Sequence, residues 1–303
     1  MTTRISLPIF LKPGLSAALL ALGSWLLPMT SAATQTPPRN GDTWQRIDAV
    51  VEQSIAAGEV PGAVLWVGRG EKLLYRKAYG LRAKVPTRQP MMLDTVFDLA
   101  SLTKVVATAT SVMILVEEGR LQLTDRVATH LPEFAQAGKE NITIQQLLTH
   151  TSGLPPSLDL EADWLGYDEA LKRAYAETPQ AGAGERFVYS DIGYIVLGEL
   201  VSKISGRALQ QFAAERIFEP LQMRDTGYRP ERDAPRIAPT QRCTAYGWPC
   251  TGTDQFMLRG IVHDPTARRM GGIAGHAGVF STAADLARYA RMILRLGELD
   301  GRR

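Results

Sequence analysis

The feature that most constrains this chain is an extended segment that leads directly into an apolar run, FDLASLTK at residues 97–104 followed by VVATATSVMILV at 105–116. The run is apolar on nearly every side of a helix, which predicts a helix buried in a core. Gly119, directly after two glutamates, predicts where this helix ends. The chain has 303 residues, 45% of them hydrophobic, so it can build such a core in one large domain or two smaller ones.

Ser101 and Lys104 are placed to act as an activated nucleophile and its base. They are three residues apart, so their side chains share one face of the helix. A serine at a helix start lies beside free N–H groups that stabilise an oxyanion, and burial disfavours the charged form of a lysine. Ser-x-x-Lys is nevertheless a short pattern, and a serine before a helix is usually an N-cap. The choice between the two interpretations depends on the rest of the chain.

The N-terminus has the pattern of a secretory signal peptide at residues 1–33. Two basic residues precede an apolar core at 14–27, and the small residues SAA at 31–33 suit cleavage. The core is too short and wrongly flanked for a stable transmembrane helix. We therefore expect a polar linker at 34–43 and a periplasmic or secreted protein with no membrane span after cleavage. An uncleaved anchor is the alternative.

The two cysteines, Cys243 and Cys250, lie close together in RCTAYGWPC at 242–250. An oxidising compartment permits a disulfide between them, and we expect one. Two free thiols are the alternative, because a bridge requires suitable geometry.

Metal ions and nucleic acids are not expected as partners. The four histidines show no metal-ligand spacing, and the net charge of +3 comes without a run of basic residues.

Hydrophobic periodicity predicts an α/β protein whose domain covers residues 44–303. An amphipathic helix is expected at 44–57, then two strands at 61–67 and 72–79 joined by a turn at 68–70. Beyond Asp125 helical periodicity dominates. We therefore expect a sheet part that includes the nucleophile helix, residues 44–125, and a mostly helical region at 126–296.

Two further motifs lie in the helical region. In LLTHTSGLP at 147–155, His150 stands beside Ser152, but Thr-Ser-Gly before Leu-Pro is typical of a turn rather than of a Ser–His pair. In FVYSD at 187–191, Tyr189 and Asp191 precede an apolar helix and can lie at its N-terminal end. Alone, this tyrosine is best interpreted as structural. No Gly-x-Ser-x-Gly occurs in the chain.

Together with PLQMRDT at 220–226, these motifs occur in the order and at the approximate spacing found in the beta-lactamase-related serine hydrolases, which the chain resembles from about residue 44 onward. That family contains class C beta-lactamases, D-alanyl-D-alanine carboxypeptidases and esterases. The resemblance implies a beta-lactamase/transpeptidase-like fold, an antiparallel sheet flanked by helices. It also implies an acyl-enzyme on Ser101, with Lys104 sharing its proton and Tyr189 acting as base and later as acid, and no cofactor.

The substrates that the resemblance implies are small molecules or peptidoglycan peptides: D-Ala-type cell-wall peptides, small esters or beta-lactams. The resemblance makes Asp191 a candidate substrate-binding residue, and it stands where the family often has asparagine. An ionised carboxylate accepts hydrogen bonds but cannot donate them, so beta-lactam turnover is the least expected activity.

The resemblance also implies a third motif, Lys-Thr-Gly or His-x-Gly, on a strand near the C-terminus whose backbone N–H supplies half of the oxyanion hole. GHAG at 275–278 mimics this motif and makes His276 a candidate substrate contact. However, the sequence after it predicts an amphipathic helix capped by Ser281 or Thr282 rather than a strand. The chain stops at Arg303, before the family's C-terminal strands and helix, so we expect an incomplete sheet. The alternative function is that of a truncated, catalytically weak or inactive penicillin-binding-like chain.

Overall fold

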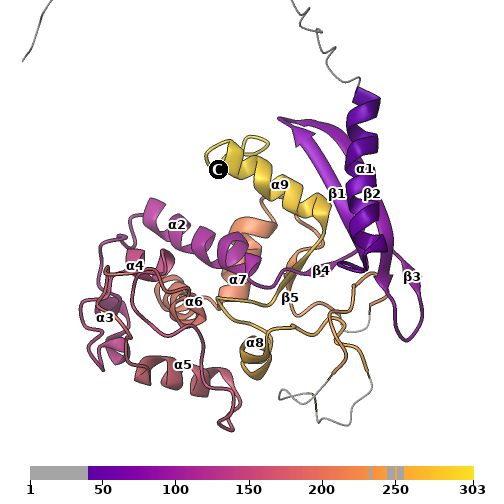
Figure 1. The fold of residues 1–303 in the computed structure, drawn as a ribbon. Helices are drawn as coiled ribbons and strands as arrows, with labels where there is room; N and C mark the ends of the chain where they lie inside the picture. Colours follow the sequence, from indigo (N-terminus) through magenta and orange to yellow (C-terminus); the bar gives the residue numbers. More distant parts are fainter. Residues whose placement is uncertain (1–39, 232–233, 244–249, 251–255) are drawn as a thin grey trace, which may run out of the picture.

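A sheet with one covering helix stands beside a helical body (Figure 1). The computed structural model describes residues 40–231, 234–243, 250 and 256–303. The predicted signal peptide and most of the predicted linker lie outside these residues. Helix α1, Asn40–Ala56, confirms the predicted amphipathic helix, although it begins within the predicted linker. No helix in the described residues is long and apolar enough to span a membrane.

The first sheet has the order β1-β2-β3 and is antiparallel. Strand β1, Gly62–Arg69, pairs with β2, Lys72–Ala83, and β2 pairs with β3, Gln89–Pro90. The two predicted strands are confirmed, but the predicted turn is placed too early. Gly68 and Arg69 belong to β1, which absorbs them through a register shift after Val67.

Helix α1 is fixed to this sheet by one aromatic contact and one carboxylate. Trp44 stacks on Tyr75 of β2 with ring centroids 4.7 Å apart. Asp48 accepts hydrogen bonds from the hydroxyls of Tyr75 at 2.6 Å and Tyr79 at 2.5 Å. The ammonium of Lys77 lies 2.8 Å from the second oxygen of the same carboxylate. The pKa of Asp48 is held at about 2, mainly through the Lys77 hydrogen bond.

A second, small sheet joins the nucleophile segment to the C-terminal part of the chain. Its order is β4-β6-β5, with β4 at Phe97–Asp98, β6 at Val279–Ser281 and β5 at Gly227–Tyr228. The prediction that a helix follows GHAG without a strand is therefore wrong. Strand β6 comes first, and helix α9, Ala283–Leu294, begins after Thr282, whose side chain accepts a hydrogen bond from the N–H of Asp285.

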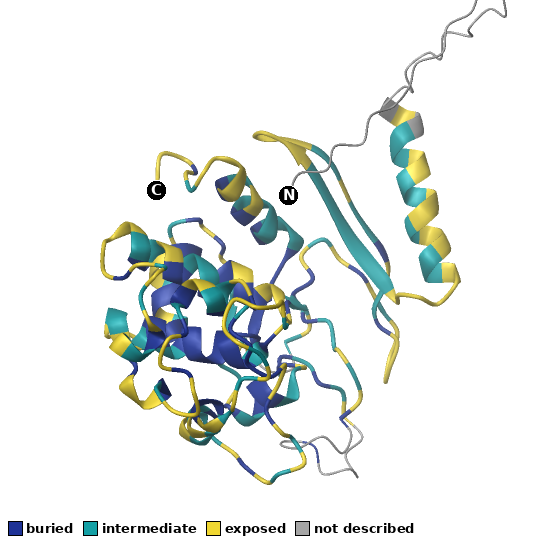
Figure 2. Cartoon of the chain, turned by 60° about the vertical axis from the view of Figure 1, so that its left-hand side comes forward, coloured by how far each residue is buried: buried dark blue, intermediate teal, exposed yellow. Residues whose placement is uncertain are grey.

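The nucleophile helix is confirmed, but it is buried on one side only (Figure 2). It comprises a π-helical segment, η1 at Lys104–Ala109, and α2 at Thr110–Glu117, and Gly119 follows with a φ of +68°. Val106, Val112 and Leu115 are buried. Val105 and Met113 are about half exposed, so the prediction of burial on nearly every side is wrong for that face.

The helical body is organised around α6, Asp191–Ser205, most of whose residues are buried. Ser190 caps its start and Gly206, with a φ of +72°, ends it. The surrounding helices are α3 Val127–His130, η2 Pro132–Phe134, α4 Ile144–Leu148, α5 Tyr167–Ala176, α7 Leu209–Ala213, η3 Ala214–Phe218 and α8 Pro265–Arg269.

The expected disulfide between Cys243 and Cys250 is present. Both residues are buried and pack with Leu258 in a small cluster of their own. Helices and antiparallel sheets in one chain confirm the predicted α/β fold class.

Candidate active site

Ser101 is presented on an exposed, strained turn between β4 and the nucleophile helix. Asp98 holds this turn: one carboxylate oxygen accepts the N–H of Ala100 at 2.8 Å, and the other accepts the N–H of His263 at 2.7 Å. Ala100 has a φ of +45°, which is unfavourable for a residue with a side chain. In the described part of the chain, the N–H of Ser101 makes no backbone hydrogen bond. It is therefore available to an oxyanion.

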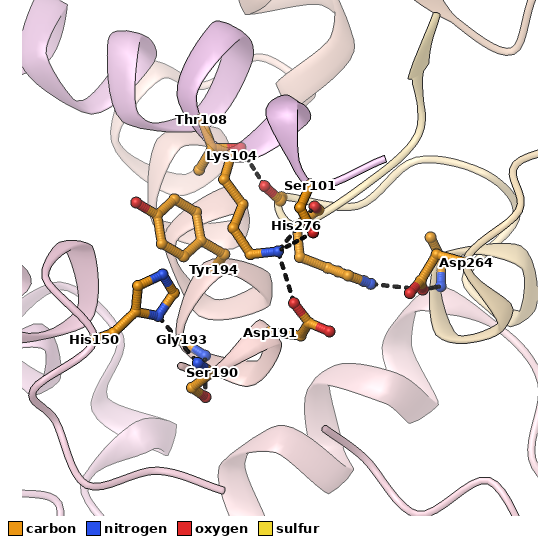
Figure 3. A network of polar contacts seen from close by, with 12 residues as sticks. Ser101, Lys104, Thr108, His150, Ser190, Asp191, Gly193, Tyr194, Asp264 and His276 are labelled. Carbon is orange, nitrogen blue, oxygen red and sulfur yellow. Dashed lines mark hydrogen bonds and ion pairs between the residues drawn. The ribbon is translucent and has the colours of Figure 1, made fainter. Parts of the chain in front are cut away.

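Lys104 is the centre of the polar network that surrounds Ser101 (Figure 3). Its side chain is 3% exposed. The ammonium lies 3.0 Å from Ser101 Oγ, 3.2 Å from the carbonyl oxygen of His276 and 2.6 Å from Asp191 Oδ1. The predicted contact between Ser101 and Lys104 is thus confirmed, and so is the burial of the lysine.

The ion pair between Lys104 and Asp191 is the part of this network that the sequence did not predict. Asp191 is the first residue of α6, so the start of that helix points its carboxylate at the lysine. The contact is an ion pair by distance, although its angles fall outside those of a hydrogen bond. A carboxylate in this position offsets part of the cost of burying the ammonium.

Tyr189 lies beside the lysine, with its side chain exposed to solvent. Lys104 Nζ lies 4.9 Å from the centre of the Tyr189 ring, and the residue is 45% exposed. The lysine therefore contacts the face of the ring. Within the described residues the Tyr189 hydroxyl makes no hydrogen bond. Its role in proton transfer stays a prediction.

His150 supports the tyrosine loop, a function that its sequence motif did not indicate. Its Nδ1 accepts the N–H of Ser190 at 3.0 Å, and its ring lies 4.4 Å from that of Tyr189. Burial, followed by the charge of Lys104, lowers the pKa of His150, so the neutral acceptor form is favoured. Ser152 accepts the N–H of Leu154 in a buried turn, as expected for a structural serine.

The predicted candidate His276 is brought to the site, but its side chain is 1% exposed. Its Nε2 lies 2.8 Å from Asp264 Oδ1, while its carbonyl oxygen accepts from Lys104. Burial raises the pKa of Asp264 more than any other single contribution lowers it, but the interactions with His276, the N–H of Ala267 and the charge of Lys104 together outweigh burial and hold the pKa at about 2. Direct contact between the His276 side chain and a substrate stays a prediction.

Asp191, Asp264 and His276 each place a ligand atom within 4.8 Å of the other two, a set that could hold a cation. Histidine spacing did not reveal this group, because it is assembled from distant segments. The ammonium of Lys104 already brings positive charge to it, which opposes binding of a metal ion. The expectation that the protein holds no metal stays a prediction.

Gly275 explains how the His276 carbonyl reaches the lysine. A β-carbon at this position would lie 1.9 Å from the carbonyl oxygen of Tyr194 and 3.1 Å from the N–H nitrogen of Gly198. Only glycine allows the chain to pass so close to α6. The N–H of Val279, in the strand that follows, donates to Thr103 Oγ1 at 3.1 Å. This N–H is therefore not free to serve an oxyanion, as the third motif's strand would require.

The family to which these residues belong is established by comparison with known proteins. A family model described as Beta-lactamase matches residues 47–303. The chain belongs to the Beta-lactamase family. The resemblance inferred from the motifs is thereby confirmed, and the fold agrees.

Two relatives and one solved structure illustrate the similarity. An N-acetylmuramyl-L-alanine amidase of Bacillus subtilis is 34% identical over 282 residues, 84% of this chain and 63% of the relative. An Escherichia coli K12 protein whose name proposes a D-alanyl-D-alanine carboxypeptidase is 30% identical over 300 residues, 89% of this chain and 68% of the relative. A penicillin-binding protein homologue of Caulobacter crescentus superposes with a TM-score of 0.68 at 27% identity, covering 86% of this chain and 72% of that one. The chain thus spans about two thirds of the length of these relatives.

Proposed function

We propose that this Beta-lactamase family member is a serine hydrolase that forms an acyl-enzyme on Ser101. The observation that carries the proposal is the buried Lys104 Nζ 3.0 Å from the exposed Ser101 hydroxyl, at the start of a helix. A nucleophile in hydrogen-bond contact with a base that a third group orients is the arrangement expected for covalent catalysis. Here the orienting groups are Asp191 and the carbonyl of His276.

In the acylation step, Ser101 Oγ bonds to the carbonyl carbon of the substrate and gives its proton to the pair formed by Lys104 and Tyr189, which enters the step one proton short of an ammonium plus a phenol. The N–H of Ser101 stabilises the developing oxyanion. The bond to the leaving group then breaks, and the proton passes to that group through Tyr189. In deacylation, water gives its proton back to the same pair and its oxygen to the acyl carbon, and Ser101 regains its proton.

The substrates we propose are D-Ala-type cell-wall peptides or small esters. Beta-lactams are the third and least expected class of substrate. The amidase and carboxypeptidase names of the two relatives support peptides of the cell wall. The carboxylate of Asp191 accepts but does not donate hydrogen bonds, so it favours a substrate that presents an N–H or O–H there. The disulfide and the signal-peptide pattern support a periplasmic or secreted location.

Turnover of a p-nitrophenyl ester and of a peptide ending in D-Ala-D-Ala tests the proposal. We expect hydrolysis of at least one substrate and a loss of about 10³-fold or more in Ser101→Ala. Ser157→Ala, which changes an exposed serine elsewhere, should leave the rate unchanged. Equal rates in wild type and Ser101→Ala would contradict the proposal.

The alternative is a substrate-binding chain with weak turnover. It is favoured by the Tyr189 hydroxyl, which makes no hydrogen bond within the described residues, and by the contact of Lys104 with the ring face instead. Slow labelling by a fluorescent penicillin without measurable hydrolysis of any substrate would support this alternative over the enzyme.

A further inference from the structure

A small pocket lined by two arginines lies outside the Ser101 site. Its volume is about 220 Å³, and Arg229 and Arg268 line it together with Val262, Gly272 and Phe280. None of its lining residues in the described ranges is acidic. Drug-sized ligands occupy larger pockets, of roughly 300 Å³ or more. Its size and charge therefore suit a small anion.

Arg268 contributes a buried arginine to the lining of the pocket. The residue is 1% exposed and belongs to α8, four residues after Asp264. Its Nη1 donates to the carbonyl oxygen of His263 at 3.0 Å. Desolvation lowers the pKa of Arg268, and the charges of Asp264 and Asp98 oppose that effect. A guanidinium holds its N–H donors in a planar fork that matches the geometry of a carboxylate, and one donor of Arg268 already serves the His263 carbonyl.

Arg229 supplies the second guanidinium from the exposed side. Its backbone has a φ of +49°, in the left-handed region that costs energy for a residue with a side chain. Its stem lies against Gly272: a β-carbon there would be 3.4 Å from Arg229 Cγ and 3.9 Å from Cδ. Gly272 itself has a φ of +87°. The left-handed backbone conformations of Arg229 and Gly272 thus place the stem of the arginine side chain along the wall of the pocket.

We propose that this pocket binds the carboxylate of a small organic acid. Arg229 and Arg268 bind the two carboxylate oxygens through charge-assisted hydrogen bonds. The apolar side chains of Val262 and Phe280 accept the short aliphatic part of the ligand. The carboxylate comes either from a free acid or from the end of a peptide, and both present the same chemistry to the two guanidinium groups.

Calorimetric titration of the 303-residue chain carrying Ser101→Ala tests the site, so its outcome does not depend on the proposed hydrolysis. The probes are N-acetyl-D-alanine, a peptide ending in the same residue, and N-acetyl-D-alaninamide, which lacks only the carboxylate charge. We expect either carboxylate to bind and the amide not to bind. If only the free acid binds, the site is one for small acids. If the peptide binds more tightly than the free acid, the site is one for the ends of peptides.

Arg229→Ala, an exposed change, should raise the Kd of the bound carboxylate about tenfold. Arg224→Ala, five residues earlier and also exposed, is the matched control and should leave the Kd unchanged. Equal binding of the amide, an unchanged Kd in Arg229→Ala, or no binding of either carboxylate at millimolar concentration would overturn the proposal. Tighter binding of inorganic phosphate than of both carboxylates would also overturn it.

Discussion

At the scale of single residues, the distinctive feature of the site is the carboxylate of Asp191 against the buried ammonium of Lys104, 2.6 Å away. An amide in its place would remove the ion pair and add a hydrogen-bond donor. We expect Asp191→Asn to slow labelling of Ser101 by a fluorophosphonate about tenfold, because the amide no longer orients the Lys104 side chain through its charge. The rate of labelling measures this. Asp159→Asn, on an exposed loop, is the control, and an unchanged or faster reaction in Asp191→Asn would contradict the orienting role given to this carboxylate.

The lowered pKa of His150 predicts how the stability of the folded protein depends on pH. Its pKa is below the ordinary value of 6.5 in the folded protein, chiefly through burial. The unfolded chain therefore binds this proton more readily, and stability is lost as pH falls below about 6.5. Asparagine tolerates the left-handed φ of +57° at this position and can accept the Ser190 N–H.

We expect the Tm of His150→Asn to fall less than that of wild type between pH 7.5 and 5.5, by roughly 2–4 °C. Thermal melts across that range measure the difference. Parallel curves for the two proteins would show that His150 does not titrate with unfolding.

At the scale of elements, the π-helical segment after Lys104 is stabilised by a helix far along the chain. The hydroxyl of Tyr289 in α9 lies 2.8 Å from Thr110 Oγ1 and donates to the carbonyl of Val105 at 3.1 Å. The carbonyl of Val105 also accepts from Thr110 Oγ1, so two side chains bond this one backbone group. These contacts thereby fix the turn on which Lys104 stands.

Removing that hydroxyl should therefore affect catalysis more than binding. We expect Tyr289→Phe to lower kcat roughly fivefold, equivalent to about 1 kcal/mol, with KM little changed. Tyr167→Phe removes a hydroxyl that bonds Glu199 between α5 and α6, away from this segment, and is the control. Steady-state kinetics on an ester substrate measure both variants; a rise in KM with unchanged kcat would contradict a positioning role for Tyr289.

Local elements were largely predictable from the sequence, whereas contacts between distant segments were not. Periodicity located α1, the β1–β2 hairpin and the nucleophile helix, because each is encoded within a short window. It missed β6, since a three-residue strand leaves no periodic pattern. It also missed the pairing of Asp264 with His276, because no local pattern marks a hydrogen bond between an N-cap and a loop.

At the scale of the whole molecule, an apolar groove runs between the nucleophile helix and α9. Its volume is about 630 Å³, and half-exposed Val105, Met113 and Ile293 lie along it. Contiguous exposed apolar surface favours association. We therefore expect the purified chain to self-associate at micromolar concentration, and the double variant Met113→Glu/Ile293→Glu to be more monomeric.

Analytical ultracentrifugation over a concentration series measures this association. The matched control is Leu165→Glu, an exposed apolar residue outside the groove, which should behave as wild type does. A monomeric wild type at all concentrations would contradict the prediction.

Peptide mass spectrometry after incubation with a fluorophosphonate or a penicillin tests whether Ser101 is a nucleophile activated by Lys104. We expect one adduct, on the peptide that contains Ser101, and no adduct there in Ser101→Ala. Labelling of another serine with equal efficiency in the alanine variant, or no label on Ser101 in the folded wild type, would contradict this expectation.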